Sequence, residues 1–277
     1  MAEGKTKVAV LMTTFNRKKY TVKAVESLIS GNPSLDMRFI VTDDHSSDDT
    51  VSALKSLNIR LKIINGDGSL FWNGGMRKSM DYALRHTDSF DYCLLINDDV
   101  DFYEGAIESL IHRLEEGKVH AVVGETSDSN GKTSYGGVRK LSKHFAKFEL
   151  IDPSKKAVLC DTFNCNCVLM TAEAFKEAGN LDPHYVHSMG DYDYGMHLNK
   201  LGFIVINSEE YVGSCQDNDI SKTWRNPLLP RGERLKLKEG PKGLPKKDWF
   251  YFVKKNYGLL PALYHSVTPY IRILIKK

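Results

Sequence analysis

Residues 7–13 read KVAVLMT, a short run of apolar and β-branched side chains that is followed directly by the segment TFNR at residues 14–17. Such runs are typical of a strand that is buried on both faces in a parallel sheet. Residues 18–29 carry apolar side chains at helical spacing, and Gly31, Asn32 and Pro33 end that pattern. The first thirty residues therefore predict a buried strand followed by a helix.

The alternation of strand and helix continues along the chain. We expect strands at residues 38–42, 61–64, 92–96, 121–124 and 203–206. We expect helices at residues 76–84, 104–115, 172–178 and 192–201. A further helix is expected to begin after Ser46 or Ser47, one of which would be its N-cap. Residues 126–156 are polar without a clear pattern, and residues 159–170 are apolar. Strands that alternate with helices imply βαβ units, so we predict an α/β, Rossmann-like fold with a mostly parallel central sheet flanked by helices.

The composition of the 277 residues is close to the average of globular proteins, with 42% hydrophobic and 26% charged side chains. It argues against a disordered chain, a collagen-like repeat or a disulfide-rich miniprotein. The N-terminus lacks the pattern of a signal peptide, and we find no run of about 18 apolar residues. The five cysteines are irregularly spaced and are expected to be reduced thiols of a cytoplasmic protein.

The charge is distributed unevenly along the chain. From residue 221 onward there are 14 Lys or Arg against three Asp or Glu, whereas the net charge of the whole chain is only +3. We therefore expect an acidic domain at 1–220 and a basic, aromatic, helical C-terminal extension at 221–277. The extension suits an anionic membrane surface on the inner face of a membrane, or it packs on the domain or on a partner in a homodimer. No motif indicates nucleic-acid binding.

Polar clusters follow several predicted strands, and parallel strands bring their carboxyl ends to one edge of the sheet. Asp43 and Asp44 follow the second strand, where a carboxylate could accept a hydrogen bond from a base N–H or a ribose hydroxyl. Asp98 and Asp99 follow the fourth strand and are hard oxygen ligands suited to Mg²⁺ or Mn²⁺ beside a diphosphate. The first turn contains no G-x-G-x-x-G, so a dinucleotide fingerprint is absent there.

Taken in order, these segments resemble inverting glycosyltransferases of family 2, which have the GT-A fold. The matching features are T-x-N-R at residues 14–17, D-D-x-S-x-D-x-T from residue 43, N-D-D at residues 97–99, and G-D-x-D at residues 190–193 followed by L-G-F at 201–203. The resemblance covers roughly residues 7–215. The stretch W-N-G-G-M-R at residues 72–77 also resembles a segment of rhamnosyltransferase-like members.

The resemblance implies a role for each matching residue. The nucleoside pocket would include Thr13, Phe15, Arg17 and Asp43 or Asp44; Asp98 would touch ribose or metal-bound water, Asp99 would be the principal ligand of the divalent cation, and Asp191 would be the general base, with Asp193 as a competitor. Gly190 stands where the family has an acidic residue, and no histidine occurs at residues 213–216, where many relatives have one.

Residues 72–75 allow two interpretations. They form a loop with a buried tryptophan, or Trp72 stacks on a sugar while Asn73 and Gly74 lie against the donor. Arg77 either pairs with the diphosphate or is an exposed helix residue. His184 and His187 are expected in a surface loop, although contact with the acceptor is an alternative.

The sequence thus predicts transfer of a sugar from a nucleoside diphosphate donor, UDP or dTDP, to a glycan or lipid-linked acceptor by metal-assisted single displacement. A carboxylate would take the proton of the acceptor hydroxyl, and the cation would neutralise the leaving group. A nucleotidyltransferase and a non-catalytic module that binds nucleotide or carbohydrate are the alternatives. A nucleotidyltransferase is expected to have a Gly-rich loop after the first strand, whereas residues 13–17 contain no glycine.

Overall fold

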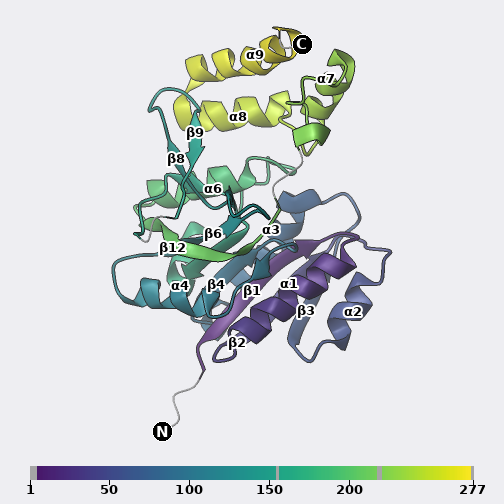
Figure 1. Ribbon diagram of the computed structural model, residues 1–277. Coiled ribbons are helices and arrows are strands. Elements are labelled where there is room, and N and C mark those ends of the chain that lie inside the picture. Colours follow the sequence, from purple (N-terminus) through teal and green to yellow (C-terminus); the bar gives the residue numbers. More distant parts are fainter. Residues whose placement is uncertain (1–4, 154–155, 217–219, 276–277) are drawn as a thin grey trace.

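The protein, described by a computed structural model at residues 5–153, 156–216 and 220–275, has a twisted sheet of nine strands as its central layer (Figure 1). The strand order is β3-β2-β1-β4-β11-β6-β12-β5, and β7 pairs with β6. Strands β3, β2, β1 and β4 are parallel, while β11 runs antiparallel to both of its neighbours. The predicted α/β fold is therefore confirmed, with one reversed strand in the middle of the sheet.

The strands are β1 Lys7–Thr14, β2 Asp36–Asp43, β3 Arg60–Asn65, β4 Tyr92–Ile96, β5 Asp101–Phe102, β6 Ala121–Ser127, β7 Thr133–Tyr135, β8 Gly137–Lys140, β9 Phe148–Leu150, β10 Thr162–Phe163, β11 Cys167–Thr171 and β12 Val205–Ser214. The helices are α1 Lys18–Gly31, α2 Thr50–Ser56, α3 Phe71–Leu84, α4 Ala106–Glu115, α5 Ala172–Ala178, α6 Gly190–Lys200, α7 Arg231–Glu239, α8 Lys246–Tyr257 and α9 Leu259–Ile275, with short 3₁₀ turns at Thr87–Ser89 and Ile220–Lys222.

Two hydrophobic cores lie on opposite faces of the sheet, because successive side chains of a strand point to opposite faces. In β1, Val8 and Val10 pack in the core beneath α1, α2 and α4, whereas Ala9 and Leu11 pack in the core beneath α3, α5 and α6. All four side chains are almost completely buried. The continuous apolar run of this strand is explained by burial on both faces.

Several boundaries agree with the sequence-based expectations and two do not. The strand expected at 92–96 is found there, and the hydroxyl of Thr171 accepts a hydrogen bond from the backbone N–H of Ala174, which caps α5 as expected. Neither Ser46 nor Ser47 caps α2, which begins at Thr50. Helix α3 begins at Phe71, so the interpretation of residues 72–75 as a loop is wrong.

The polar segment at 126–156 contains three short strands that no periodicity revealed. Strand β7 extends the main sheet, and β8 and β9 form a second, three-stranded sheet with β10. Strands of two to four residues are too short to display an alternating pattern. This small sheet lies beneath the C-terminal helices on the side of α6 (Figure 1).

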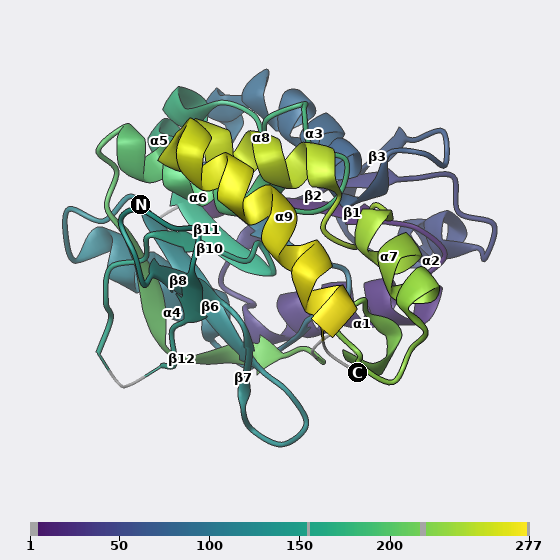
Figure 2. The same cartoon turned by 90° about the horizontal axis from the view of Figure 1, so that it is seen from above.

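The C-terminal helices α7, α8 and α9 form a layer above the carboxyl edge of the sheet (Figures 1 and 2). A third apolar cluster joins this layer to the rest of the protein: Tyr185 and Met196 pack against Trp249, Phe252 and Val253 of the C-terminal helices. In the part of the chain that the structure describes, no helix is long and apolar enough to cross a membrane. The domain boundary at residue 220 stays a prediction.

Candidate active site

A cleft of about 330 Å³ lies at the carboxyl edge of the sheet, between the ends of β1 and β4 and the beginning of α6. Its walls contain Arg17, Trp72, Asp98, Asp99 and Asp191, which come from distant parts of the sequence. A larger hollow of about 650 Å³ between α4 and β12 contains none of the predicted site residues. The smaller cleft is the candidate site because it lies at the carboxyl edge of the sheet and is lined by residues that the sequence predicts as site residues.

The two carboxylates after β4 face the guanidinium group of Arg17. Its nitrogens lie 3.2 Å from an oxygen of Asp98 and 2.7 Å from an oxygen of Asp99. Burial raises the pKa of Asp98 to about 6, and the neighbouring Asp99 adds to this rise while Arg17 opposes it. Without the guanidinium group, the adjacent carboxylates of Asp98 and Asp99 would repel each other strongly in this cleft. The guanidinium balances only one of their two negative charges, so the site favours binding of a further cation.

Asp191 lies in the first turn of α6, on another wall of the same cleft. One of its oxygens accepts a hydrogen bond of 2.8 Å from the backbone N–H of Tyr192. The side chain of Asp191 is half-buried in the wall of the cleft. Burial raises its pKa to about 6, and backbone hydrogen bonds to the carboxylate oppose this rise. Met189, just before the helix, has a left-handed backbone (φ 73°), a strained conformation of the kind that occurs at functional sites.

Asp43 and Asp44, which the sequence could not distinguish, have different surroundings. The carboxylate of Asp44 accepts hydrogen bonds from the backbone N–H groups of Gly68, Leu70 and Phe71, so it stabilises the turn that begins α3. Asp43 accepts one bond from the backbone of Ser46, and its other oxygen is buried without a hydrogen-bond partner among the described residues. Asp43 is therefore the carboxylate whose hydrogen-bonding capacity is not filled by the described residues.

Replacing Asp44 with alanine is expected to lower the free energy of unfolding by about 2–3 kcal/mol, because three backbone donors lose their acceptor. Chemical denaturation measures this change, and Asp88→Ala, which removes an exposed carboxylate, should change it by less than about 0.5 kcal/mol. Unchanged stability together with a loss of nucleotide affinity would instead assign the ligand-binding role to Asp44.

Trp72 reaches the cleft from the first turn of α3. Its indole N–H donates a hydrogen bond of 2.7 Å to the side-chain oxygen of Asn97, which follows β4 and also lines the cleft. The bond fixes the plane of the indole ring beside Asp98 and Asp99. Asn97 was not among the predicted binding residues; its position in the N-D-D triplet was the available signal.

Asn73, predicted to bind the donor, points away from the cleft. It is completely buried, and its amide donates hydrogen bonds to the backbone oxygens of Asp182 and Tyr185. A Cβ atom at Gly190 would lie 2.0 Å from its side-chain oxygen. Asn73 therefore holds the segment before α6, and this contact explains why position 190 carries glycine instead of the acidic residue that the family resemblance implies.

The remaining predicted residues lie around the cleft without lining it. Thr13 packs against Gly75 of α3, and Phe15 is half exposed beyond the end of β1. Gly74 faces Leu70. Arg77 donates a hydrogen bond to the backbone oxygen of Leu181, so it is engaged away from the cleft rather than in it.

His187 lies in the loop before α6, as expected, and it also lines the cleft. Its Nδ1 accepts a hydrogen bond of 3.4 Å from the backbone N–H of Trp72. Burial, with a contribution from the charge of Lys242, lowers its pKa to about 4. The imidazole is therefore neutral near pH 7. Lys242 comes from the C-terminal extension and also lines the cleft, and no pattern in the sequence indicates this position.

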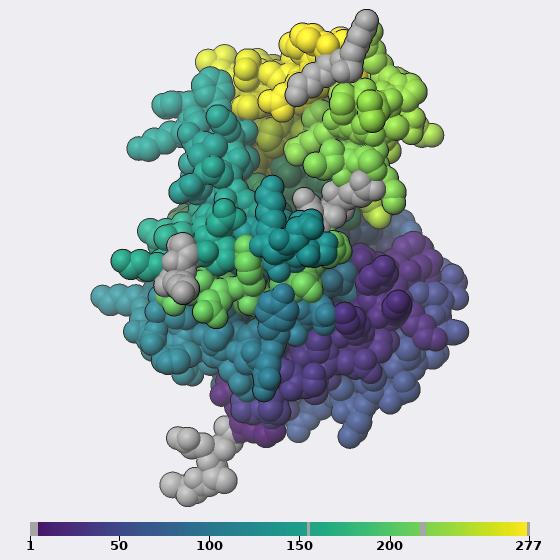
Figure 3. All heavy atoms as spheres, in the orientation of Figure 1, coloured from purple at the N-terminus to yellow at the C-terminus, as the bar shows by residue number. Residues whose placement is uncertain are grey.

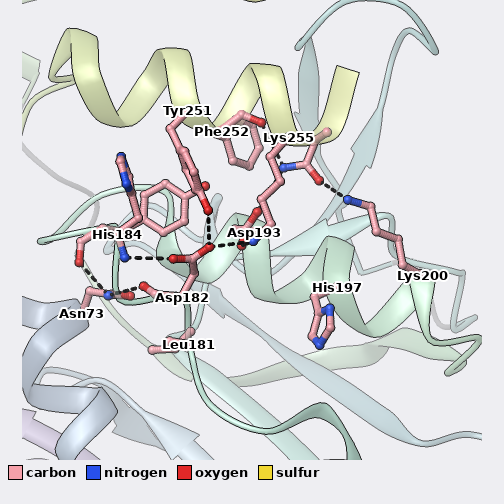
Figure 4. A network of polar contacts seen from close by, with 12 residues as sticks. Asn73, Leu181, Asp182, His184, Asp193, His197, Lys200, Tyr251, Phe252 and Lys255 are labelled. Atoms are coloured by element: carbon pink, nitrogen blue, oxygen red, sulfur yellow. Dashed lines mark hydrogen bonds and ion pairs between the residues drawn. The ribbon is translucent and has the colours of Figure 1, made fainter. Parts of the chain in front are cut away.

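Asp193, the alternative base, faces away from the cleft toward the C-terminal extension (Figure 4). Its carboxylate is buried and contacts the ammonium group of Lys255 at 2.5 Å and the amide of Asn256 at 3.1 Å. Lys255 also lies 2.7 Å from Asp182, which accepts a further bond from Tyr251. Of the two candidates for the general base, Asp191 lines the cleft and Asp193 does not.

Lys255→Ala is expected to lower the free energy of unfolding by about 2 kcal/mol, because it leaves the buried carboxylate of Asp193 without its cation. Lys255→Arg should retain much of the stability. Lys254→Ala removes an exposed ammonium group from the same helix and serves as the matched control. Equal midpoints of urea denaturation for Lys255→Ala and Lys254→Ala would show that this network does not hold the extension.

A divalent cation in the cleft would need oxygen, nitrogen or sulfur ligands close to Asp99. Among the described residues, no group of three or more His, Cys, Asp or Glu side chains is arranged to hold a metal. Cys215, near the position of the missing histidine, is buried with its thiol 3.6 Å from an oxygen of Asp99. Two carboxylates still suit Mg²⁺ or Mn²⁺ when substrate phosphates supply further oxygens. The donor set of Asp98 and Asp99 therefore fits a cation that binds together with a diphosphate.

Solved structures show the same architecture. A mannosyltransferase from Pyrobaculum calidifontis, in complex with GDP-Man and Mn²⁺, superimposes with a TM-score of 0.59 at 14% identity, covering 98% of this chain and 75% of that one. S. aureus TarS 1–349 gives 0.57 at 14% identity, covering 97% and 81%. These similarities, together with the sheet and its flanking helices, define the fold as GT-A.

The sequence comparisons identify the family. The profile described as "Glycosyl transferase family 2" matches residues 9–179, more than half of the chain, and the chain belongs to this family. A curated relative from Campylobacter jejuni subsp. jejuni serotype O:2, named GalNAc(5)-diNAcBac-PP-undecaprenol beta-1,3-glucosyltransferase, is 32% identical over 118 residues. The match covers 41% of this chain and 36% of the relative, so the chain spans little more than a third of that protein's length.

Proposed function

We propose that the protein transfers a sugar from a nucleoside diphosphate donor to a hydroxyl group of a glycan or lipid-linked acceptor, with inversion at the anomeric carbon. The observation that carries this proposal is the shared cleft, because Asp98 and Asp99 line it together with Asp191. One wall can thus receive the diphosphate while a separate carboxylate meets the acceptor hydroxyl.

The nucleoside would bind at the ends of β1 and β2. Thr14 and Asp43 are paired in the register of these strands, so their side chains lie on the same face of the sheet, and one oxygen of Asp43 has no hydrogen-bond partner among the described residues. A carboxylate there accepts a hydrogen bond from the ring N–H of uracil or thymine, which supports UDP or dTDP as the carrier. Trp72, whose indole N–H donates a hydrogen bond to Asn97, would stack on the donor sugar.

Asp99 would be the principal ligand of Mg²⁺ or Mn²⁺, with Asp98 beside it. When bound, the cation supplies Lewis-acid neutralisation of the diphosphate leaving group. Arg17 balances part of the charge of the two carboxylates, and its guanidinium would also pair with phosphate oxygens. Two of the similar structures support this assignment, because the Pyrobaculum enzyme is described with GDP-Man and Mn²⁺ and GalNAc-T7 with UDP, GalNAc and Mn²⁺.

Asp191 would accept the proton of the acceptor hydroxyl as the oxygen attacks the anomeric carbon. The bond to the diphosphate breaks on the opposite face of the sugar, so one displacement inverts the configuration. A base with a pKa of about 6 is largely ionised at pH 7 and still a useful proton acceptor. The undecaprenol-linked glycan in the name of the Campylobacter relative supports a lipid-linked acceptor.

We also propose that the reaction takes place in the cytoplasm. All five cysteines are buried and unpaired. Unpaired thiols are the rule in a reducing compartment, where disulfides are rare.

The test measures release of nucleoside diphosphate from UDP-, dTDP- and GDP-sugars, with and without glycan acceptors and with Mn²⁺, Mg²⁺ or EDTA. Acceptor-dependent release that EDTA abolishes is expected for a UDP- or dTDP-sugar, and NMR of the product should show the inverted anomer. Donor binding without release would identify a non-catalytic module. Release of pyrophosphate from a nucleoside triphosphate would identify a nucleotidyltransferase.

A further inference from the structure

The outermost helix, α9, presents a row of apolar side chains to solvent. This row, called here the outer stripe of α9, consists of residues separated by three, four or seven positions that are 44–78% exposed: Leu260, Leu263, Tyr264, Val267, Ile271, Leu274 and Ile275. Residues at this spacing lie on one face of a helix. Single exposed apolar residues are common in proteins, but a continuous row along a whole helix marks an interaction surface.

The opposite face of α9 fixes the helix to the protein. Ala262, Ser266 and Ile273 are buried against the layer below, and the indole N–H of Trp249 donates a hydrogen bond to the backbone oxygen of His265. The guanidinium of Arg234 in α7 contacts the backbone oxygen of Ile273 at 3.3 Å. The fold therefore holds the outer stripe toward solvent. Helix α9 lies nearest the viewer in Figure 2 and at the top of the molecule in Figure 3.

The surroundings of the outer stripe are basic and aromatic. Helix α9 contains no Asp or Glu, and Arg272 is exposed on it. The loop between β8 and β9 reaches the same surface, where the half-exposed ring of Phe145 packs edge-on against Tyr264 with 5.6 Å between ring centres. Lys143 and Lys147, exposed on that loop, add positive charge. An apolar row bordered by cations matches the headgroup region of an anionic bilayer.

We propose that the outer stripe of α9 binds to the surface of an anionic membrane, with the helix lying in the plane of the headgroups. Helix α9, of 17 residues, is about 25 Å long, and in the described chain no helix meets the requirements of a membrane span. A second copy of the chain is a poorer occupant, because a symmetric contact through α9 would bring two basic extensions together. The proposal is independent of the donor and of the reaction.

The orientation has a consequence for the acceptor, which rests on the proposed function. The C-terminal layer that carries α9 also contributes Lys242 to the wall of the cleft. Membrane binding through α9 would therefore hold the cleft beside the bilayer surface. An acceptor with a lipid anchor could then be reached without leaving the membrane.

The test is sedimentation of the full chain with vesicles of phosphatidylcholine, with or without phosphatidylglycerol. We expect binding to the anionic vesicles that weakens with salt and is much weaker on phosphatidylcholine alone. The double variant Leu263→Glu/Val267→Glu should lower the partition coefficient on anionic vesicles by more than about tenfold. Leu159→Glu, which alters an exposed leucine of the catalytic domain, should bind as the parent chain does.

Two further measurements keep the outcomes separate. Circular dichroism must show that the double variant is folded, and release of nucleoside diphosphate in the presence of a water-soluble acceptor should be unchanged by it. Failure to bind vesicles by a folded, active parent chain would overturn the proposal and leave the proposed function intact. A dimer in light scattering that the double variant converts to a monomer, with no vesicle binding, would assign the outer stripe to a second copy.

Discussion

Replacing Asp191 with asparagine is expected to lower the rate of sugar transfer by a factor of about 10²–10⁴, the usual contribution of a general base. The change keeps the size of the side chain and removes the group that accepts the proton. Donor binding, measured by calorimetry, should remain near that of the parent chain because the amide neither adds nor removes bulk. Normal turnover at saturating substrate with weakened donor binding would contradict this role.

The pH dependence of the parent enzyme provides a second measurement of the same residue. The base must be ionised, so kcat/KM should fall below a pH of about 6 as Asp191 becomes protonated. Because its pKa is raised in the folded state, its ionisation destabilises the fold, and this cost appears as the pH rises from about 4 to about 6. Asp191→Asn should therefore be more stable than the parent at pH 7, by about 1 kcal/mol.

Replacing Asp99 with asparagine is expected to lower transfer by a factor of about 10²–10³ and to raise the Mn²⁺ concentration needed for half-maximal activity. An amide is a weaker ligand than a carboxylate, and the charge of Arg17 would then be balanced by Asp98 alone. Activity titrations with Mn²⁺ and Mg²⁺ measure both effects. Binding of Mn²⁺ by the chain with nucleoside diphosphate, followed by electron paramagnetic resonance, should weaken in parallel.

Asp101→Asn is the matched control for this change. Asp101 lies two residues further along and pairs on the surface with Lys23, outside the cleft. Its replacement should leave the Mn²⁺ titration unchanged, because exposed ion pairs contribute little. Equal effects of Asp99→Asn and Asp101→Asn, or full activity of the former in EDTA, would remove Asp99 from the proposed metal site.

Much of the fold could be predicted because local patterns and tertiary packing agree. The run at 92–96 is apolar throughout because β4 is a central strand. It pairs with β1 in parallel and with β11 in antiparallel orientation, and helices cover both faces of the sheet. Thr171 caps the start of α5 with its side chain, and Gly179 ends the helix with a positive φ of 69°. Both signals are local, so they can be recognised in the sequence. The sequence pattern places the start of α3 at residue 76 instead of residue 71, because Gly74 and Gly75 are poor helix formers. Asp44, distant in sequence, supplies the acceptor that stabilises its first turn.

The candidate site was predictable in part for the same reason. Carboxylates at the ends of adjacent strands must lie at one edge of a parallel sheet, so the position of Asp98 and Asp99 follows from the strand pattern. Nothing local distinguishes Asp43 from Asp44, whose roles depend on a loop more than twenty residues away. Likewise, Asn73 appears as a polar residue beside Trp72, and only the packed structure shows that it holds the segment before α6.

The sequence by itself determined the alternation of strand and helix, the acidic edge of the sheet and the basic character of the last 57 residues. Periodicity and charge are properties of near neighbours, so they can be read along the chain. The tertiary structure alone decided that Asp191 shares a cleft with Asp99, that Asp193 is bound by Lys255, and that α9 turns its leucines outward. These facts depend on contacts between segments far apart in sequence, and such contacts are set by how the layers pack.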